Sequence, residues 1–377
     1  MAGIYIHIPF CRSLCNYCDF YRVTNSIKKN DLLKCMLKEI DMKNEFFGHE
    51  SVETIYFGGG TPSILSDDNI NLLIDKIYSS FDVSENTEIS LEVNPDDLSS
   101  GYLKSLKNNT LINRLSIGIQ SFIDRDLLLM NRRHNAEKAV NSIKQSLDAG
   151  FLNLSIDLIY GLPGMSQNDW EYNLNMAFSM EIKHLSAYHL TIEEGTVFAG
   201  YIKAGKFSEV NEEESINQFS SLVDIAGKNG FVQYEISNLA KESYFSKHNS
   251  NYWKQKKYLG IGPSAHSYNL QSRHWNIANN DEYIKRINQN RSFYQSEQLD
   301  NVTKYNEFVM TGLRTMWGIN PDEITIKFGD LLFEYFNRNS EKFIKNSELQ
   351  KDGQSIKLTD KGKFVSDYII SELMFVE

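Results

Sequence analysis

Short apolar runs alternate with longer segments of helical spacing through the first half of the chain. The runs have the length and composition of buried strands, and they cover residues 4–8, 54–57, 88–93, 114–118, 153–159 and 184–190. Between the runs, apolar residues recur every three or four positions, as in the set Leu33, Met36, Leu37 and Ile40. Repeated strand–helix units pair their strands in parallel. Six units are fewer than the eight that close a barrel, so the pattern predicts an α/β fold with a partial (β/α)6 barrel.

The pattern changes after residue 200. It predicts an acidic helix over 211–228 and a short strand over 232–236, after which aromatic residues become frequent. From residue 301 onward the spacing is mostly helical, and the chain closes with pieces that resemble the strand–turn–helix of a winged-helix unit. We therefore predict a barrel over 1–200, a connecting segment over 201–300, and a mainly helical, winged-helix-like C-terminal domain over 301–377.

Composition and charge narrow the classes of function. Hydrophobic residues at 41% and aromatic residues at 12% suffice for a packed core, which excludes a disordered chain. The net charge of −10 disfavours a nucleic-acid partner. The sequence contains neither a run of 18 apolar residues nor a secretory signal, so we expect no transmembrane segment. Four cysteines, three of them clustered, favour a reducing compartment, and we expect a cytoplasmic protein.

The clustered cysteines form the first candidate site. Cys11, Cys15 and Cys18 have the spacing C-x3-C-x2-C and directly follow the first predicted strand. Three buried, reduced cysteines are one interpretation, and a zinc site completed by His7 or Asp19 is another. Three thiolates in one short loop also suit a cubane cluster that leaves one iron without a protein ligand.

The segment YIHIPFCRSLCNYCDF resembles the cluster loop of the radical SAM superfamily, including an aromatic residue, Tyr17, just before the third cysteine. This resemblance implies a [4Fe–4S] cluster whose open iron binds the amino and carboxylate groups of S-adenosylmethionine. In that family, one-electron reduction cleaves the cofactor to a 5′-deoxyadenosyl radical. The fourth cysteine, Cys35, falls in the first predicted helix, and we expect a partly exposed structural cysteine and not a fourth cluster ligand.

Polar residues and glycines follow the ends of successive predicted strands, where parallel barrels collect their chemistry. The run GGGTP follows the second strand, Glu92 lies at the end of the third, and Gln120 follows the fourth. Asp157 lies in the fifth strand, and Arg132 comes 12 residues after Gln120. Each of these residues alone is more typical of a tight turn, a solvated loop or a helix cap. Their repetition at one end of successive units predicts a shared pocket.

The resemblance assigns these residues to S-adenosylmethionine. It implies that the glycine motif binds the methionine end, that the two carboxylates hold ribose hydroxyls, and that the other side chains complete the pocket. The cofactor-binding residues implied in this way are Tyr5, Tyr17, Gly59, Gly60, Thr61, Glu92, Gln120, Arg132, Asp157 and Thr191.

The motifs IHIPFC, GGGTPS, RLSIGIQSF and DLIYGLPG are similar to those of the coproporphyrinogen-dehydrogenase-like branch of the superfamily. Within that branch, the resemblance allows an enzyme or a carrier: an oxygen-independent coproporphyrinogen III dehydrogenase, or a heme chaperone of the HemW type. The dehydrogenase has a further cysteine two residues after the third, where this chain has Phe20, and a long arm before its cluster loop, where this chain has ten residues before Cys11. Both departures favour the chaperone.

A second motif, HNSNYW at residues 248–253, matches the H-N-x-x-Y-W motif of the chaperone branch. Without the resemblance, it is more typical of a structured loop with a hydrogen-bonded histidine. Histidine is a common heme-iron ligand, and aromatic rings provide flat apolar walls. The resemblance therefore makes His248 the first candidate for a heme ligand, with Tyr252 as a second ligand or a wall residue.

The sequence thus predicts a protein that binds a [4Fe–4S] cluster, S-adenosylmethionine and heme, and that passes heme to an acceptor protein. An electron donor for the cluster is implied, and a homodimer is compatible with the resemblance. A radical SAM enzyme acting on RNA is a third class, which the charge of −10 disfavours.

Overall fold

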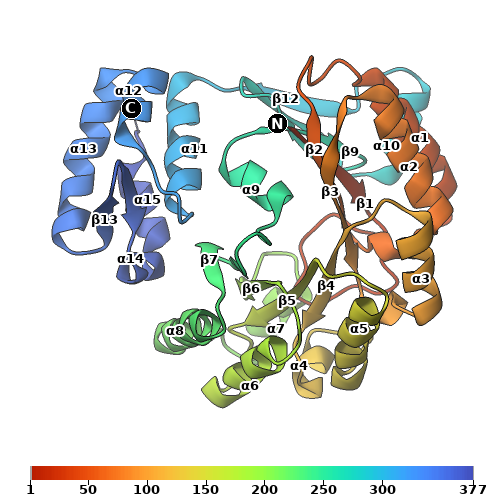
Figure 1. Ribbon diagram of the computed structural model, residues 1–377, viewed down its shortest axis with the longest axis horizontal. Coiled ribbons are helices and arrows are strands. Elements are labelled where there is room, and N and C mark those ends of the chain that lie inside the picture. Colours follow the sequence, from red (N-terminus) through yellow and green to blue (C-terminus); the bar gives the residue numbers. More distant parts are fainter. Residues whose placement is uncertain (1, 377) are drawn as a thin grey trace.

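Seven parallel strands form the centre of the structure, a computed structural model that describes residues 2–376 (Figure 1). Six of them coincide with the strands predicted from the apolar runs, which confirms the α/β fold with a partial parallel barrel. In their order across the sheet, the parallel strands are β9 (Lys257–Ile261), β1 (Ala2–Ile8), β2 (Val52–Gly59), β3 (Val83–Val93), β4 (Arg114–Gln120), β5 (Leu154–Tyr160) and β6 (His184–His189).

Short antiparallel strands extend both edges, so that the whole sheet has 12 strands. The pattern predicted only one of these, β7, because the others are short and all but β8 are rich in polar residues. Residues 201–300 therefore supply both edges of the barrel sheet, and β9 pairs directly with β1. The antiparallel strands are β10 (His266–Tyr268), β11 (Ser272–Asn276) and β12 (Tyr294–Gln298) beyond β9, and β8 (Asn238–Ala240) and β7 (Val232–Glu235) beyond β6.

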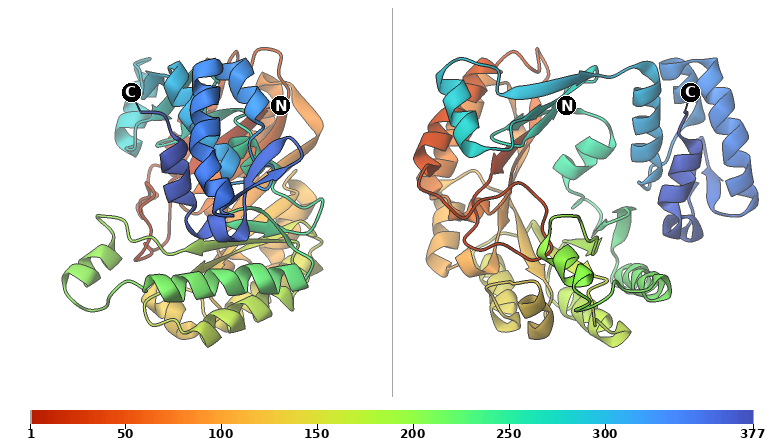
Figure 2. Two further views of the ribbon diagram at one scale, coloured as in Figure 1. Left: turned by 90° about the vertical axis from the view of Figure 1, so that its left-hand side faces the viewer. Right: turned by 180° about the vertical axis from the view of Figure 1, so that it is seen from behind.

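Helices cover the outer face of the sheet, as Figures 1 and 2 show. A representative one begins at the N-cap Ser66, whose side chain accepts a hydrogen bond from Asn69 N, and it buries one apolar face against the strands. The helices of this layer are α1 (Lys29–Met42), α2 (Asp67–Ser80), α3 (Ser100–Asn109), α4 (Asp124–Leu129), α5 (Ala136–Asp148), α6 (Gln167–Phe178), α8 (Glu212–Lys228) and α10 (Asn280–Asn288). Short 3-10 turns, η1 (Pro62–Ile64) and η2 (Pro95–Asp97), follow β2 and β3.

The inner face of the barrel is polar. In β1, Ile4, Ile6 and Ile8 are buried in the hydrophobic core, whereas the alternate residues Tyr5 and His7 contact other rings and polar groups of the inner face. Helix α9 (Lys247–Trp253) packs against β1 and β2 on this concave side (Figure 1). The lumen is therefore filled by polar and aromatic side chains and by one short helix.

The C-terminal residues form a second hydrophobic core, which includes Tyr305, Phe336 and Ile369. This unit lies beside the barrel, to which it connects through ring contacts such as Phe219–Phe364 (Figure 1). Its elements are α11 (Asn301–Leu313), α12 (Pro321–Phe328), α13 (Asp330–Lys345), β13 (Leu349–Asp352), β14 (Ser355–Leu358), α14 (Asp360–Phe364) and α15 (Ser366–Leu373). The three-region division 1–200, 201–300 and 301–377 stays a prediction.

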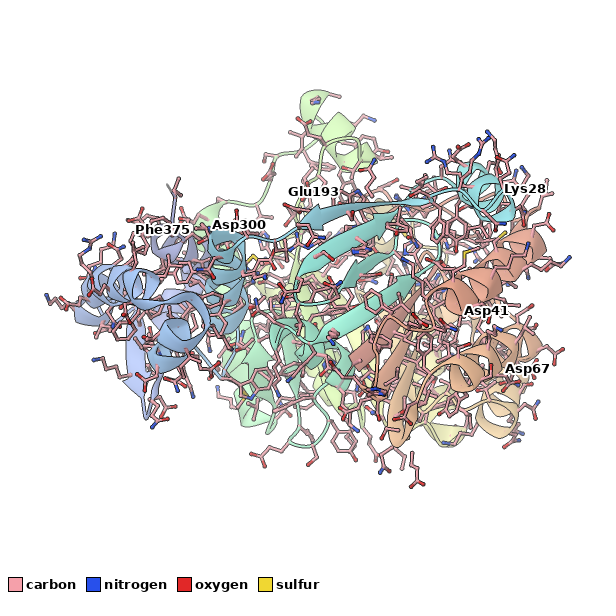
Figure 3. The ribbon with its side chains drawn as sticks, turned by 90° about the horizontal axis from the view of Figure 1, so that it is seen from above. Lys28, Asp41, Asp67, Glu193, Asp300 and Phe375 are labelled. Atoms are coloured by element: carbon pink, nitrogen blue, oxygen red, sulfur yellow. The ribbon has the colours of Figure 1, made fainter. Side chains whose placement is uncertain are left out.

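One helix, α7 (Val197–Lys203), belongs to neither layer. It lies on a segment that leaves the barrel after β6, near Glu193 (Figure 3). None of the helices within residues 2–376 combines the length and apolar character that a membrane crossing requires.

Candidate cofactor site and the buried histidine

A cavity of about 480 Å³ opens at the C-terminal ends of the parallel strands. The cysteine loop forms one wall, and the ends of β2 to β6 form the others. Tyr5 lies next to this lining, on the inner face of β1. The structure thus brings together nearly all the residues predicted from sequence: Cys11, Cys15, Tyr17, Cys18, Gly59, Gly60, Thr61, Glu92, Gln120, Arg132, Asp157 and Thr191.

Backbone hydrogen bonds fix the cysteine loop at both ends and at its tip. Cys11 N donates to Val23 O at 2.9 Å, and Val23 N donates to Pro9 O at 2.7 Å, which closes the base of the loop. At the tip, Asn16 N donates to Met130 O at 3.1 Å, so that the loop rests on the end of α4. The three thiols are unpaired and partly exposed. The loop therefore presents its sulfur atoms on a fixed backbone.

Two side chains donate hydrogen bonds to the cysteine sulfurs. Arg132 Nη1 lies 3.3 Å from Cys15 Sγ, and Thr61 Oγ1 lies 3.4 Å from Cys11 Sγ. Burial raises the pKa of the Cys11 thiol, while the Thr61 hydroxyl lowers it. Arg132 is itself held by Asn94 Oδ1 and by Gly118 O, both at 2.7 Å. A fixed guanidinium beside the sulfurs favours the thiolate form that binds iron.

The glycine motif allows the end of β2 to approach the cysteine loop. Gly59 has a φ of 110°, a conformation that residues with a Cβ rarely adopt. At Gly60, a Cβ would lie 3.0 Å from Cys11 Sγ and 2.8 Å from Phe10 O. Any side chain at Gly60 would therefore collide with the cysteine loop.

Two carboxylates project into the cavity from neighbouring parts of the inner face. Glu92 accepts a hydrogen bond from Tyr56 Oη at 2.7 Å, and Asp157 accepts one from Ser116 Oγ at 3.2 Å. Burial raises the pKa of Glu92 to about 7 and that of Asp157 to about 6. The loss of solvent strengthens any hydrogen bond that these oxygens accept from a ligand hydroxyl.

Gln120 reaches the same cavity through an uncommon backbone conformation. Its φ is 69°, in the left-handed region, at the last residue of β4. Strained backbone of this kind concentrates at ligand sites, where the surrounding structure holds it.

These observations fit the two cofactors implied by the resemblance. Cys11, Cys15 and Cys18 would hold a [4Fe–4S] cluster, and the glycine wall and carboxylates would hold S-adenosylmethionine. When bound, the pair supplies one-electron reduction and radical chemistry, while the protein binds, orients and shields.

The two heme candidates lie elsewhere. His248 and Tyr252 are on α9, next to the first residues of β1 and β2, and neither lines the cavity. Thr54 Oγ1 lies 2.7 Å from His248 Nδ1, and Tyr252 Oη lies 2.9 Å from His248 Nε2. The imidazole also stacks on Tyr56, with ring centroids 5.0 Å apart. Burial lowers the pKa of His248 to about 3, so the ring is neutral. Both of its nitrogens have hydrogen-bond partners.

Sequence reasoning missed three residues of these sites. Tyr56 holds Glu92, Asn94 holds Arg132, and Thr54 contacts His248. The alternation of Thr54, Tyr56 and Gly58 along β2 is a signal that all three share the inner face. Asn94 directly follows the third strand, as its motif LEVNP shows.

The fold and this site define a class of protein. The family model of the radical SAM superfamily matches residues 5–177, and that of the HemN C-terminal domain matches residues 299–365. The solved structure of coproporphyrinogen III oxidase (HemN) from Escherichia coli, a radical SAM enzyme, has the same fold, with a TM-score of 0.85 and 21% identity over 99% of this chain and 90% of that one. The chain is a radical SAM protein with a HemN-type C-terminal region, and this class implies a [4Fe–4S] cluster and S-adenosylmethionine.

Relatives that match nearly the whole chain identify the family within this class. The heme chaperone HemW of Bacillus subtilis is 31% identical over 377 residues, which cover 99% of each chain. That of Lactococcus lactis is 32% identical over 359 residues, 95% of this chain and 93% of the relative. The chain therefore belongs to the HemW family, which confirms the branch predicted from its motifs.

Proposed function

We propose that this protein is a heme chaperone that binds a [4Fe–4S] cluster, S-adenosylmethionine and heme, and transfers heme to an acceptor protein. The observation that carries the proposal is the contact between His248 and Tyr252 on α9, in a chain similar over its full length to proteins named heme chaperone HemW. An electron donor for the cluster belongs to the proposal, and a homodimer is compatible with it.

The chemistry of α9 suits heme. His248 is neutral at physiological pH, so one of its ring nitrogens is unprotonated and can bind iron. The present partner of its Nε2 is the Tyr252 hydroxyl at 2.9 Å, which iron would replace. The rings of Tyr5 and Tyr56 lie at centroid distances of 6.5 and 5.0 Å from the imidazole. These rings offer flat walls for a macrocycle.

The alternative function is oxidative decarboxylation by a coproporphyrinogen III dehydrogenase. Phe20 stands where that enzyme has its additional cysteine, and its side chain is 65% exposed at the rim of the cavity. We therefore expect no protoporphyrinogen in an anaerobic assay with coproporphyrinogen III, reductant and S-adenosylmethionine. Turnover in that assay would make the chain an enzyme of the dehydrogenase type.

A hemin titration tests the proposed function. We expect a Soret band that saturates near one hemin per chain, with and without a reconstituted cluster. The band should weaken in His248→Ala and persist in His274→Ala, a matched control outside the HNSNYW motif. An unchanged spectrum in His248→Ala would reject His248 as the ligand, and the absence of any stoichiometric band would reject the function.

A further inference from the structure

His248 is closed to iron in this structure. Only 3% of the residue is exposed, and both ring nitrogens have partners, Thr54 and Tyr252. The ring also stacks on Tyr56. A heme iron needs one nitrogen and an open face beside it, so α9 must move before the proposed ligand can act.

A buried carboxylate fastens the start of α9. Glu88, on β3, is 6% exposed, and its two oxygens accept hydrogen bonds from Lys247 N at 3.2 Å and His248 N at 3.1 Å. The N-cap Ser246 Oγ adds a third contact to Glu88 at 3.4 Å. A negative charge at the N-terminus of a helix also interacts favourably with its dipole. Glu88 and Thr54 therefore hold the same short helix from two neighbouring strands.

Polar atoms at the other end of the motif lack partners. Across residues 2–376, no hydrogen-bond partner is found for the buried atoms Ser250 Oγ, Asn251 Nδ2 and Trp253 Nε1. Buried polar groups are normally paired, because leaving one unpaired forfeits its hydration. These three atoms of one seven-residue helix thus have no partner among the described protein atoms.

Two non-glycine residues in the left-handed region flank α9. Ser243 has a φ of 71° and Gln255 a φ of 51°. Gln255 is the left-handed residue that ends α9, where Lys256 N donates to Asn251 O at 2.9 Å. Ser243 lies in the turn that Tyr244 N closes on Lys241 O at 3.0 Å. Both positions therefore mark the boundaries of the segment that carries α9.

We propose that Thr54 and Glu88 are positioning residues of the heme site: they keep α9 on the inner face of the barrel, and heme binds His248 only after α9 moves away from that face. This inference rests on the proposed function and specifies how its site opens. In the open state, His248 Nε2 exchanges the Tyr252 hydroxyl for iron, and the polar atoms of the motif reach solvent.

Hydrogen exchange of the full-length protein without heme tests the hold on α9. Thr54→Val removes the hydroxyl with little change in shape, and Glu88→Gln replaces one acceptor oxygen by a donor. For the loss of about one hydrogen bond, we expect exchange in residues 244–254 to quicken about tenfold in each variant. Thr87→Val is the matched control, because this buried hydroxyl donates to the backbone carbonyls of Val52 and Ser84 and, among the described residues, makes no bond to α9.

Hemin association kinetics test the second half of the proposal. We expect faster association in Thr54→Val and Glu88→Gln, and an unchanged rate in Thr87→Val. Unchanged exchange in both variants would overturn the hold on α9. Faster exchange with an unchanged association rate would overturn its control of heme binding. The proposed function fails on a different measurement, the absence of a stoichiometric Soret band in the wild type, so the two failures are distinguishable.

Discussion

The two ends of the barrel lumen share one inner face but differ in how accessible their side chains are to a ligand. At the C-terminal end, the cavity is open, and titratable side chains such as Glu92, Asp157 and Arg132 face it. At the other end, α9 fills the lumen, and His248 is neutral and enclosed. The comparison teaches that the cavity at the C-terminal strand ends is open to a ligand as it stands, whereas the imidazole of His248 is enclosed.

The two ends differ in the partners that their polar groups have. The cavity keeps carboxylate and sulfur atoms toward the open space and holds them by strained or glycine backbone, as at Gly59 and Gln120. At the closed end, His248, Thr54 and Glu88 satisfy one another. Internal pairing stabilises the closed end but leaves its imidazole without a free nitrogen.

The largest effect that we predict concerns the cluster loop. Cys15→Ser removes one of three thiolates, so the reconstituted protein should fall from about four irons per chain to near zero. Iron analysis and the electron paramagnetic resonance of the reduced cluster measure this loss. Cys35→Ser is the control, and its iron content should stay unchanged. The expectation that Cys35 is partly exposed is wrong, because α1 buries it against the core, away from the loop. Full iron loading in Cys15→Ser would mean that the cluster is held elsewhere.

The second-largest effect that we predict concerns Asp157, a carboxylate of the open end, which we compare with an acidic residue on the surface. Asp157→Asn removes the charge from a hydrogen bond to the ligand, so we expect S-adenosylmethionine to bind about 10- to 100-fold more weakly. Anaerobic calorimetry on the reconstituted protein measures the affinity. Asp148→Asn, on an exposed acid at the end of α5, should leave it unchanged. Equal affinities for S-adenosylmethionine in the wild type, Asp157→Asn and Asp148→Asn would contradict a contact between Asp157 and the cofactor.

A pH experiment probes the closed end. The pKa of His248 is about 3 in the folded protein, below its ordinary value of 6.5, so the unfolded state binds the extra proton. Stability contributed by the neutral ring is therefore present above pH 6.5 and is lost as the pH falls, by about 2 kcal/mol between pH 7 and pH 5. Urea unfolding of the wild type and of His248→Gln at both pH values measures it.

The wild type must be compared with His248→Gln because Glu92 and Asp157 change the free energy of unfolding with pH in the opposite direction. Their pKa values are raised to about 7 and about 6, so they favour the folded state at acid pH and lose that effect as the pH rises. Both carboxylates are present in the wild type and in His248→Gln, so their contribution cancels. A pH dependence identical in the two proteins would show that His248 is protonated without cost.

The smallest effect concerns Phe20. Its side chain is 65% exposed, so Phe20→Ala should change the free energy of unfolding by no more than about 0.5 kcal/mol. Iron content should also remain at the wild-type level. A loss of iron in this variant would assign Phe20 a part in shielding the cluster.

The apolar runs predicted the parallel strands well because helices cover their outer face, so residues such as Ile4 and Ile6 must be apolar. The edge strands β10, β11 and β12 escaped prediction because they are short and partly exposed. The cavity residues were predictable because the ends of parallel strands converge. Thr54 and Glu88 were not, since an inner-face residue acquires its partner only when α9 folds back from a distant part of the chain.

Tyr56 contacts residues at both ends of the lumen. Its hydroxyl donates to Glu92 in the cofactor cavity, and its ring stacks on His248 beneath. A ligand that draws Glu92 toward a ribose alters the bond that orients this ring. Thermodynamic linkage would make such an influence mutual: a ligand in the cavity and a ligand at His248 would change each other's affinity by the same factor. A single phenol thus places the cavity and the enclosed imidazole in direct contact with one another's surroundings.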